Sequence, residues 1–479
     1  MRALIGLDIG TTAVKALAVS EDDGTILARC EAGYPLSTPR PGWAEQDPDD
    51  WWRATEQVLE ALGVDEVAGI GLSGQMHGLV ALDGRNRVIR PAILWNDGRT
   101  ASECAEIEAT VGLEELIART GNRALTGFTA PKLLWLRRHE PDAYRRIARI
   151  MLPKDYVRLR LCGEHATDVA DASGTLLLDV ARRRWSEEVL AALELDPAWL
   201  PVVRESPEVS GHTPAGVPVA AGAGDQAAGA LGVGVDRPGP LSIALGTSGV
   251  VFAALPAFAA DERARVHAFC HAVPGGWHAM GVMLSAAGSL SWLRDVAAPG
   301  MGFGELVEAA VAWEPGAEGL TFLPYLAGER TPHADPGARG SFTGLSLRHD
   351  RGALTRAVLE GVAYGLRDSF DLLSGLGGPS ERGRVSGGGA RSELWLRIIA
   401  AVLELPLERP VVEEGAAYGA AMLGGVAGGT WPDTESAVVA CVRVRDEVEP
   451  DPAWVRVYAE GRERFRALYP ALRDARPLK

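Results

Sequence analysis

Short apolar runs alternate with glycine- and threonine-containing turns along most of the chain. One run, Ala3–Leu7, leads to Asp8, and a Gly-Thr-Thr turn separates it from a second run, Val14–Val19. Runs rich in Val, Ile, Leu and Ala, bounded by such turns, predict β-strands. Over Leu354–Leu373 the apolar residues instead recur at helical spacing. This mixture predicts an α/β fold.

The opening pattern recurs about halfway along the chain. Ile5–Val14 and Leu241–Val250 both follow the order strand, Gly-Thr-Thr or Gly-Thr-Ser turn, strand. The segment Gly232–Pro240 is rich in Gly and Pro and would end any preceding helix. We therefore expect two related domains, residues 1–236 and 240–479.

Composition narrows the class of protein. The chain has 479 residues, of which 47% are hydrophobic and 23% charged, as in soluble enzymes. The net charge of -15 argues against a nucleic-acid-binding surface. We find no secretory signal and no apolar run long enough to span a bilayer. The five scattered cysteines form no Cys-x-x-Cys pair, which argues against a zinc site or a disulfide framework. A cytoplasmic protein is expected.

The two Gly-Thr turns are candidate phosphate sites. A glycine lets the backbone approach an anion, and the following hydroxyls and N–H groups are donors. In the first turn, a carboxylate at the end of the strand would organise Mg²⁺ beside the phosphates. An ordinary β-hairpin is the alternative for the first turn taken alone. The second turn gains its significance as the partner of the first. The candidate residues are Asp8, Thr11, Thr12 and Lys15 in the first turn, and Gly246, Thr247 and Ser248 in the second.

A further carboxylate, Asp225, stands between a strand and a helix. An apolar run ends at Gly222 and Gly224, and a helix of small residues follows Asp225. The segment is not the dinucleotide fingerprint, because Gly229 comes too late. A carboxylate in this position is well placed to face a cleft. The alternative is that it only caps the helix.

Three other segments carry candidate ligand contacts. Gly388 and Gly389, after a short strand, would let a flat ligand approach the backbone, although a plain strand-to-helix turn is also possible there. His77, beside Met76, interrupts an apolar pattern between glycines, and its alternative is a satisfied core histidine. Trp95–Arg99 combines an aromatic plate with an amide, an acid and a guanidinium, as sugar sites do, or else forms a surface turn.

These motifs occur in an order that resembles the FGGY carbohydrate kinases, over nearly the whole chain. Gly127–His139 fits the first signature of this family. Met76–Gly78, Trp95–Asp97 and Gly42–Gln46 resemble the xylulose-kinase subgroup in particular. In glycerol kinases, an Arg-Glu pair would be expected where Met76 and His77 stand, so glycerol is disfavoured as the substrate.

The resemblance implies a fold of two ribonuclease-H-like domains, of the actin/hexokinase ATPase type, around a nucleotide cleft. Domain 1–236 would hold the sugar site and the catalytic base, and domain 240–479 the nucleotide site. Pro324–Arg330 also looks family-like, and structure at the cleft rim is its default role. The implied roles are Asp225 as the base, Asp8 for metal and phosphates, Met76 and His77 as sugar contacts, Gln226, Trp95 and Asp97 as further substrate contacts, Gly246 and Thr247 for phosphates, and Gly388 and Gly389 for adenosine.

The expected reaction is transfer of a phosphoryl group from ATP to D-xylulose, with Mg²⁺. Asp225 would accept the proton of the C5 hydroxyl, a role that needs an ionised carboxylate and no raised pKa. The alternatives are a kinase for another ketose or polyol, such as D-ribulose, and an actin-like nucleotide-switched binding protein. The expected partners are a small-molecule sugar and ATP, without nucleic acid or a membrane; a homodimer stays open.

Overall fold

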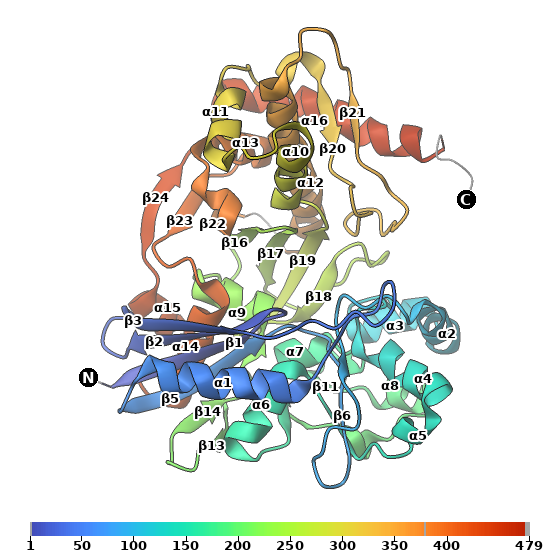
Figure 1. Cartoon of the computed structure of the whole chain (residues 1–479), viewed down its shortest axis with the longest axis vertical. Coiled ribbons are helices and arrows are strands. Elements are labelled where there is room, and N and C mark those ends of the chain that lie inside the picture. Colours follow the sequence, from blue (N-terminus) through green and yellow to red (C-terminus); the bar gives the residue numbers. More distant parts are fainter. Residues whose placement is uncertain (1, 378–379, 475–479) are drawn as a thin grey trace.

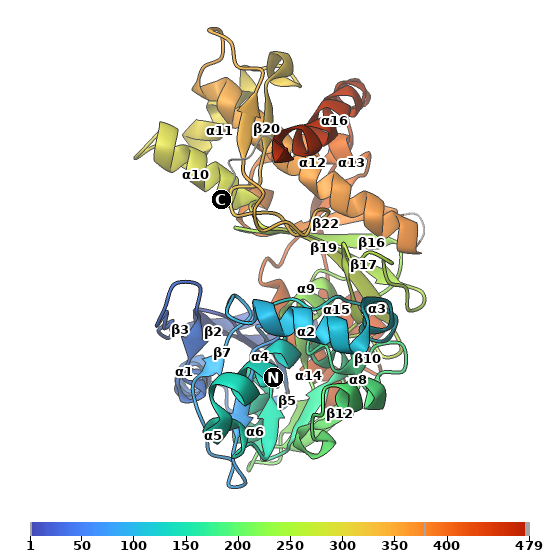
Figure 2. The same cartoon turned by 90° about the vertical axis from the view of Figure 1, so that its right-hand side faces the viewer.

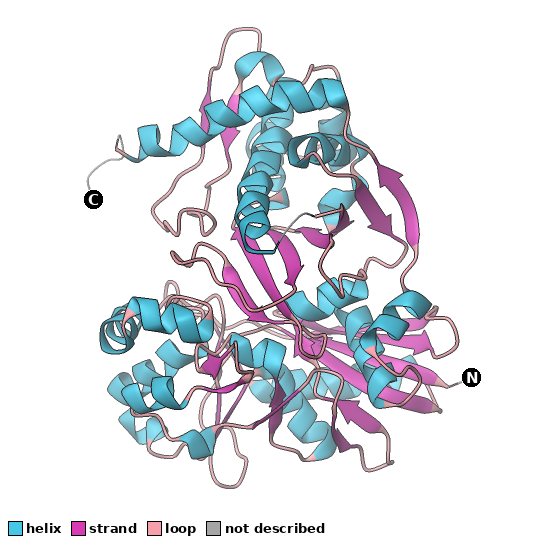
Figure 3. Cartoon of the chain, turned by 180° about the vertical axis from the view of Figure 1, so that it is seen from behind, coloured by secondary structure: helices cyan, strands magenta, loops and turns pink. Residues whose placement is uncertain are grey.

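The chain folds around two β-sheets, one in each half of the sequence, with helices packed around them (Figure 1, Figure 3). The computed structural model describes residues 2–377 and 380–474. In the described ranges, no helix combines the length and the apolar character needed to cross a membrane.

The first sheet has the order β13-β14-β5-β1-β2-β3, and β15 also pairs with β5. β1 is antiparallel to β2 and parallel to β5, with Asp8 opposite Ser73. The end of β5 also pairs with β15, where Gly74 lies opposite Gly224. The C-terminal ends of β1 and β5 and the start of the Asp225 segment therefore meet at one edge of the sheet. The strands are β1 (Ala3–Ile9), β2 (Ala13–Ser20), β3 (Ile26–Gly33), β5 (Val67–Gly74), β13 (Val209–His212), β14 (Pro218–Ala220) and β15 (Ala223–Gly224).

The second sheet repeats the arrangement at the centre of the first. β16 is antiparallel to β17 and parallel to β22, as β1 is to β2 and β5. The two strand-turn-strand units predicted from the sequence are thus confirmed. The sheet order is β18-β19-β17-β16-β22-β23-β24. The strands are β16 (Pro240–Leu245), β17 (Gly249–Leu255), β18 (His267–Cys270), β19 (Trp277–Met283), β22 (Arg382–Ser386), β23 (Leu407–Pro410) and β24 (Val444–Val448).

Helix boundaries follow local capping rules. Helix α1 begins at Pro48, and the Asp47 carboxylate accepts a hydrogen bond from the Asp49 N–H, which satisfies a free backbone donor. The predicted helix over Leu354–Leu373 forms within the buried α12. The other helices of eight or more residues in the described chain are α2 (Ala101–Val111), α3 (Leu113–Thr120), α4 (Thr129–His139), α6 (Pro153–Cys162), α9 (Asp225–Gly232), α10 (Ala287–Ala297), α11 (Phe303–Val311), α13 (Glu393–Leu403), α14 (Gly415–Ala427), α15 (Thr434–Cys441) and α16 (Pro452–Arg473), beside α1 (Pro48–Leu62) and α12 (Arg351–Gly377).

Short elements complete the first half beside its sheet, where α2, α4 and α5 lie together (Figure 1, Figure 2). They include α5 (Pro141–Tyr144), α7 (Val169–Ser173), α8 (Glu187–Ala192), β4 (Glu45–Gln46), β6 (Val80–Leu82), β7 (Ala92–Ile93), β8 (Arg149–Met151), β9 (Ala166–Asp168), β10 (Leu178–Asp179), β11 (Arg184–Trp185) and β12 (Val202–Arg204). In the second half, β20 (Thr321–Leu323) pairs with β21 (Ser341–Thr343).

Helix α14 comes from the second half of the sequence but packs on the first sheet. Glycines make this close approach possible: a Cβ on Gly71 would lie 1.8 Å from the Ala420 carbonyl oxygen, and one on Gly6 would lie 1.9 Å from that of Ala417. The same buried cluster includes Trp431 and residues of α15. The expected domain 240–479 is therefore not a separate body in space, because α14 and α15 complete the first half.

Candidate active site

Asp8 and Asp225 lie at the edge where β1, β5 and β15 meet. Asp8 accepts a hydrogen bond from the Ser73 hydroxyl at 3.3 Å, and Lys15 stands opposite it on β2. Asp225 is the first residue of α9; Gly224 is the N-cap, and no side chain caps this helix. Asp225 therefore does not cap the helix, as the alternative interpretation of this segment would require.

The two carboxylates influence each other's ionisation. Burial and the negative charge of Asp8 raise the pKa of Asp225 to about 7, against hydrogen bonds from Gln226. Burial also raises the pKa of Asp8, and the charge of Lys15 and the Ser73 hydrogen bond oppose this rise. Like charges at one half-buried edge disfavour ionisation of both groups. Binding of a proton or a cation would reduce the repulsion between the two carboxylates, so the site is suited to accept either one.

Met76 and His77 pack directly beside the Asp225 segment. A Cβ on Gly224 would lie 2.7 Å from Met76 Cγ, so the glycine leaves room for the methionine. His77 adopts a φ of 71°, which is uncommon for a residue other than glycine. Its Nδ1 lies 2.7 Å from the Gly174 carbonyl oxygen. Burial lowers the pKa of His77 to about 3, so the imidazole is neutral at pH 7.

The signature segment Gly127–His139 holds His77 in this conformation. The Lys132 ammonium donates to the His77 carbonyl oxygen at 2.7 Å and to that of Gly127 at 2.6 Å. The Thr129 hydroxyl donates to the same His77 oxygen at 3.0 Å. The ring of Phe128 packs on the imidazole, with 4.6 Å between centroids. These contacts give the sequence signature a positioning role next to the candidate sugar site.

The first Gly-Thr turn is tied to residues far away in the sequence. The Trp95 indole N–H donates to the Thr11 hydroxyl at 2.9 Å, and the Gln46 amide donates to the Thr11 carbonyl oxygen at 2.7 Å. Gln75 also bonds to Gln46, at 3.1 Å. Thr12 and Lys15 are exposed. Trp95 thus lies at the candidate phosphate turn, with 40% of its surface exposed.

Asp97 is occupied by other protein groups. Its carboxylate accepts hydrogen bonds from the Ala44 N–H at 2.6 Å and from the Arg99 guanidinium at 2.6 and 2.8 Å. The side chains of Asp97 and Arg99 are almost fully buried, and Arg99 stacks over Trp43 at 3.6 Å. This geometry gives Asp97 a role in holding the loop, rather than in contacting a ligand. Gln226, by contrast, is half-buried beside Asp225.

The second Gly-Thr turn connects β16 to β17. Thr247 and Ser248 are exposed and Gly246 is half-buried. Backbone N–H groups at the start of α10 donate to the carbonyl oxygens of Gly246 and Thr247 at 2.8–3.1 Å. These bonds fix the turn while its hydroxyls stay accessible.

Gly388 and Gly389 line a cavity of about 750 Å³ between α10, α11 and the start of α13. Leu290, Phe303 and Val307 contribute apolar surface to it. Gly388 has open space where a Cβ would stand. A cavity of this size with apolar walls and exposed backbone suits a flat aromatic ligand such as a purine base.

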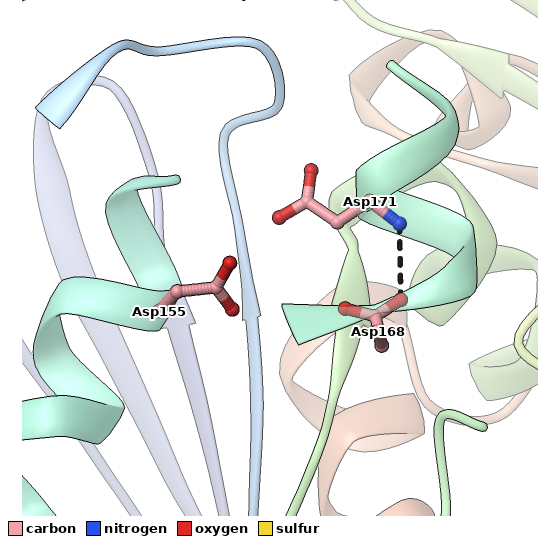
Figure 4. Close-up of side chains that lie close together, drawn as sticks. All are labelled: Asp155, Asp168 and Asp171. Atoms are coloured by element: carbon pink, nitrogen blue, oxygen red, sulfur yellow. Dashed lines mark hydrogen bonds between the residues drawn. The ribbon is translucent and has the colours of Figure 1, made fainter. Parts of the chain in front are cut away.

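A buried charged cluster, which sequence inspection missed, lies beneath the site. Asp155, Asp168 and Asp171 approach one another from α6, β9 and α7, and the Asp171 N–H donates to Asp168 at 2.9 Å (Figure 4). Three carboxylates suggest a metal site, but the Lys154 ammonium lies 2.6 Å from Asp155, 2.6 Å from Asp168 and 3.3 Å from Asp171. Lysine thus supplies the cation. The residues come from three successive elements, and their local sequence does not show that these elements bring the four charges together.

Comparison with known proteins identifies the family. Residues 3–232 match the N-terminal domain of the FGGY family of carbohydrate kinases, and residues 241–428 match its C-terminal domain. The chain belongs to this family, which confirms the resemblance and the carbohydrate-kinase class. An actin-like binding protein without a sugar substrate is therefore excluded as the class.

Individual relatives cover almost the whole chain. A xylulose kinase of Escherichia coli (strain K12) is 43% identical over 98% of this chain and 99% of its own. The crystal structure of a xyloylose kinase from Brucella ovis is 42% identical, with a TM-score of 0.94 over 99% of this chain and 100% of that one. The xylulose kinase of Rhodospirillum rubrum is 36% identical, with a TM-score of 0.92 over 99% of both chains. The implied two-domain fold is confirmed.

Proposed function

We propose that this chain transfers the γ-phosphoryl group of ATP to the C5 hydroxyl of D-xylulose, forming ADP and D-xylulose 5-phosphate. The observation that carries the proposal is the meeting of Asp8, Asp225 and the Met76-His77 pair around one sheet edge. The full-length similarity to proteins named xylulose kinases supports the choice of sugar.

Asp225 is proposed as the general base. As the C5 oxygen attacks the γ-phosphorus, its proton passes to the carboxylate, and the bond from phosphorus to the ADP oxygen breaks. A base contributes about 10²–10⁴-fold in such reactions. With a pKa of about 7, the carboxylate accepts a proton readily at neutral pH and remains substantially ionised above pH 7.

The remaining side chains position the reactants. Met76 and His77 contact the sugar, with the neutral imidazole offering a hydrogen bond through Nε2. Thr11, Thr12 and Lys15 from one side, and Gly246, Thr247 and Ser248 from the other, hold the phosphates. Gly388 and Gly389 pack against adenosine in the cavity of about 750 Å³. Closure of the two halves would align the groups and exclude water.

Mg²⁺ fits the carboxylates at this edge. Their mutual repulsion, seen in the raised pKa of Asp225, is what a divalent cation would offset, and carboxylate oxygens are its preferred ligands. Asp8 is the proposed metal-organising residue. When bound, Mg²⁺ supplies charge neutralisation at the phosphate oxygens.

Cytoplasmic localisation and the absence of a nucleic-acid partner are further proposals. The five cysteines are free thiols, as expected in a reducing compartment, and the net charge of -15 disfavours polyanions. A homodimer stays open and is tested by the molar mass of the protein in solution.

The test is turnover in an ADP-release assay with D-xylulose, D-ribulose and glycerol at matched concentrations. D-xylulose should give the highest kcat/KM, with glycerol the weakest substrate. A higher kcat/KM with D-ribulose would assign the chain to another ketose. ADP release unaffected by any sugar would overturn the proposal altogether.

A further inference from the structure

The segment Pro324–Arg330 has no role in the proposed chemistry so far, but its end is fixed beside the second sheet. Glu329 Oε1 accepts hydrogen bonds from the N–H groups of Leu284 at 3.0 Å and Arg330 at 2.8 Å. The Thr331 N–H donates to the Val282 carbonyl oxygen, and the Val282 N–H donates to the Thr331 hydroxyl, both at 3.0 Å. Residues 329–331 therefore run along the end of β19.

This position lies across β19 from the second phosphate turn. Val282 of β19 lies opposite Val250 of β17, and Met283 lies opposite Gly249. Gly249 closes the Gly246–Gly249 turn. Both backbone groups of Val282 bond to Thr331, so residues 329–331 lie on the edge of β19 opposite β17. They are two strand-to-strand spacings from the turn, or about 10 Å, which is a distance that a long arginine side chain can largely span.

On its other side, Arg330 approaches the candidate sugar site. The Arg330 guanidinium is close enough to His77 and His267 for its charge to help lower the pKa of both. His267 begins β18 and bonds to Asn122 of the first half at 2.8 Å. Its ring packs on Phe128, the residue that also packs on His77. Arg330 therefore lies at the junction of the two halves near His77, with the second phosphate turn across β19.

The Arg330 side chain makes no hydrogen bond or ion pair with any residue in the described ranges. The adjacent acid, Glu329, turns Oε1 toward two backbone N–H groups, and burial raises the pKa of this acid to about 8. Burial lowers the pKa of Arg330 itself. A guanidinium held without a counter-charge is costly unless an anion arrives.

We propose that the Arg330 guanidinium donates hydrogen bonds to the phosphoryl group while this group is transferred from ATP to the sugar. The proposal rests on the proposed function, because a ketose is neutral and the anion that the site handles is the phosphoryl group. The planar guanidinium matches two phosphoryl oxygens at once. Arg330 forms no covalent bond and exchanges no proton; it stabilises charge that spreads over the equatorial oxygens as the phosphorus changes partners.

The first experiment compares Arg330→Met and Arg330→Lys with wild type and with a matched control, Arg339→Met. Arg339 is exposed, lies in the same loop region and bonds only to nearby backbone oxygens. We expect Arg330→Met to lose at least about 100-fold in kcat, with the KM for ATP changed less than about threefold. Arg330→Lys should recover part of the loss, added guanidinium should partly restore Arg330→Met, and Arg339→Met should match wild type.

Melting temperature separates this role from a structural one. Because no carboxylate forms an ion pair with the Arg330 guanidinium in the described ranges, its removal should leave the melting temperature unchanged or raise it. A lowered melting temperature accompanied by loss of ADP binding would mean that the segment only supports the fold, and it would overturn the proposal. Wild-type kcat in Arg330→Met would overturn it as well.

The second experiment uses ADP with aluminium fluoride and Mg²⁺ as a mimic of the transferring phosphoryl group. Arg330→Met should bind this complex at least about 100-fold more weakly than wild type and bind ADP alone equally well. Equal loss for both, or for neither, would overturn the role. This readout needs no turnover of xylulose. A wild-type protein inactive on xylulose would thus refute the proposed substrate without deciding the role of Arg330.

Discussion

Two groups of acids in the first half of the molecule, one fully buried and one half-buried, differ in what neutralises them. Asp155, Asp168 and Asp171 surround the Lys154 ammonium, and Arg158 lies 3.1 Å from Asp155. Among the described residues, Asp8 and Asp225 form no ion pair, and the exposed Lys15 stands opposite Asp8 on β2. The first group carries its own counter-ions, whereas the second leaves charge unbalanced at an accessible edge.

This difference separates stability from function. Burial alone would lower the pKa of Lys154, but the charges of the three aspartates raise it, so the cluster is held as ion pairs. Burial and Asp8 instead raise the pKa of Asp225 to about 7. The paired cluster thus fixes α6, β9 and α7 under the site, and the unpaired carboxylates remain free to meet a proton or a metal.

The largest expected effect is that of Asp225→Asn, which removes the base with little change of shape. Turnover should fall by about 10²–10⁴-fold, while ATP still binds. Steady-state kinetics and ATP binding by calorimetry measure the two quantities. Near-normal turnover would remove Asp225 from the mechanism.

The same variant sharpens the contrast in stability. The substitution removes a like-charge repulsion with Asp8, so the free energy of unfolding at pH 8 should stay equal to that of wild type or increase. Urea unfolding measures it. A clear loss of stability would indicate that Asp225 belongs with the structural acids.

Lys154→Met should reverse this pattern. The substitution leaves three buried carboxylates without their cation, and breaking a buried ion pair costs about 3–5 kcal/mol of unfolding free energy. Arg160→Met on the same helix is the control, because Arg160 pairs with Asp49 at the surface and such pairs contribute about 0–1 kcal/mol. Equal effects of the two substitutions in urea unfolding would contradict the structural role of the cluster.

The pH profile gives an effect of about tenfold. The folded-state pKa of Asp225 is about 7, above its ordinary value of 3.8, so the ionised base is lost as the pH falls below 7. We expect kcat/KM at pH 6 to be about one tenth of its plateau above pH 8. The free energy of unfolding changes in the opposite direction. It should decrease as the pH rises from about 4 to 7, because ionisation of this group destabilises the folded state. Initial rates from pH 5.5 to 9 test the first statement, and a profile without an inflection near pH 7 would contradict it.

The smallest expected effect is that of His77→Ala. Loss of one neutral hydrogen bond to the sugar should raise the KM for the sugar by about 3–10-fold, with the KM for ATP unchanged. His212→Ala, at an exposed position on β13, is the control. An unchanged KM for the sugar would remove His77 from the sugar site.

Much of the fold was predictable because its signals are local. The strands on either side of each Gly-Thr turn and the α12 helix follow from apolar spacing over a few residues, and both formed as predicted. The domain limits were harder to predict. Helix α14 follows the predicted boundary in sequence but packs on the first sheet, because glycines such as Gly71 admit its backbone.

The candidate site divides in the same way. Asp8, Asp225, Met76 and His77 were identified from their local sequence, and the sheet register brings the first two to one edge. Asp97 also had a suggestive local sequence, yet Arg99 and the Ala44 N–H occupy its carboxylate. Whether a polar side chain is free depends on partners that the sequence does not place.

The sequence by itself determined the alternation of strands and turns, the carboxylates at strand ends and the class of enzyme, because each is encoded in short, contiguous patterns. Only the tertiary structure decided which charges are balanced. Lys154 forms ion pairs with three acids, whereas the Arg330 side chain forms none in the described ranges, although both are cations next to an acid in sequence. Coulomb energies depend on distance and burial in space, and these are set by the packing of segments remote along the chain.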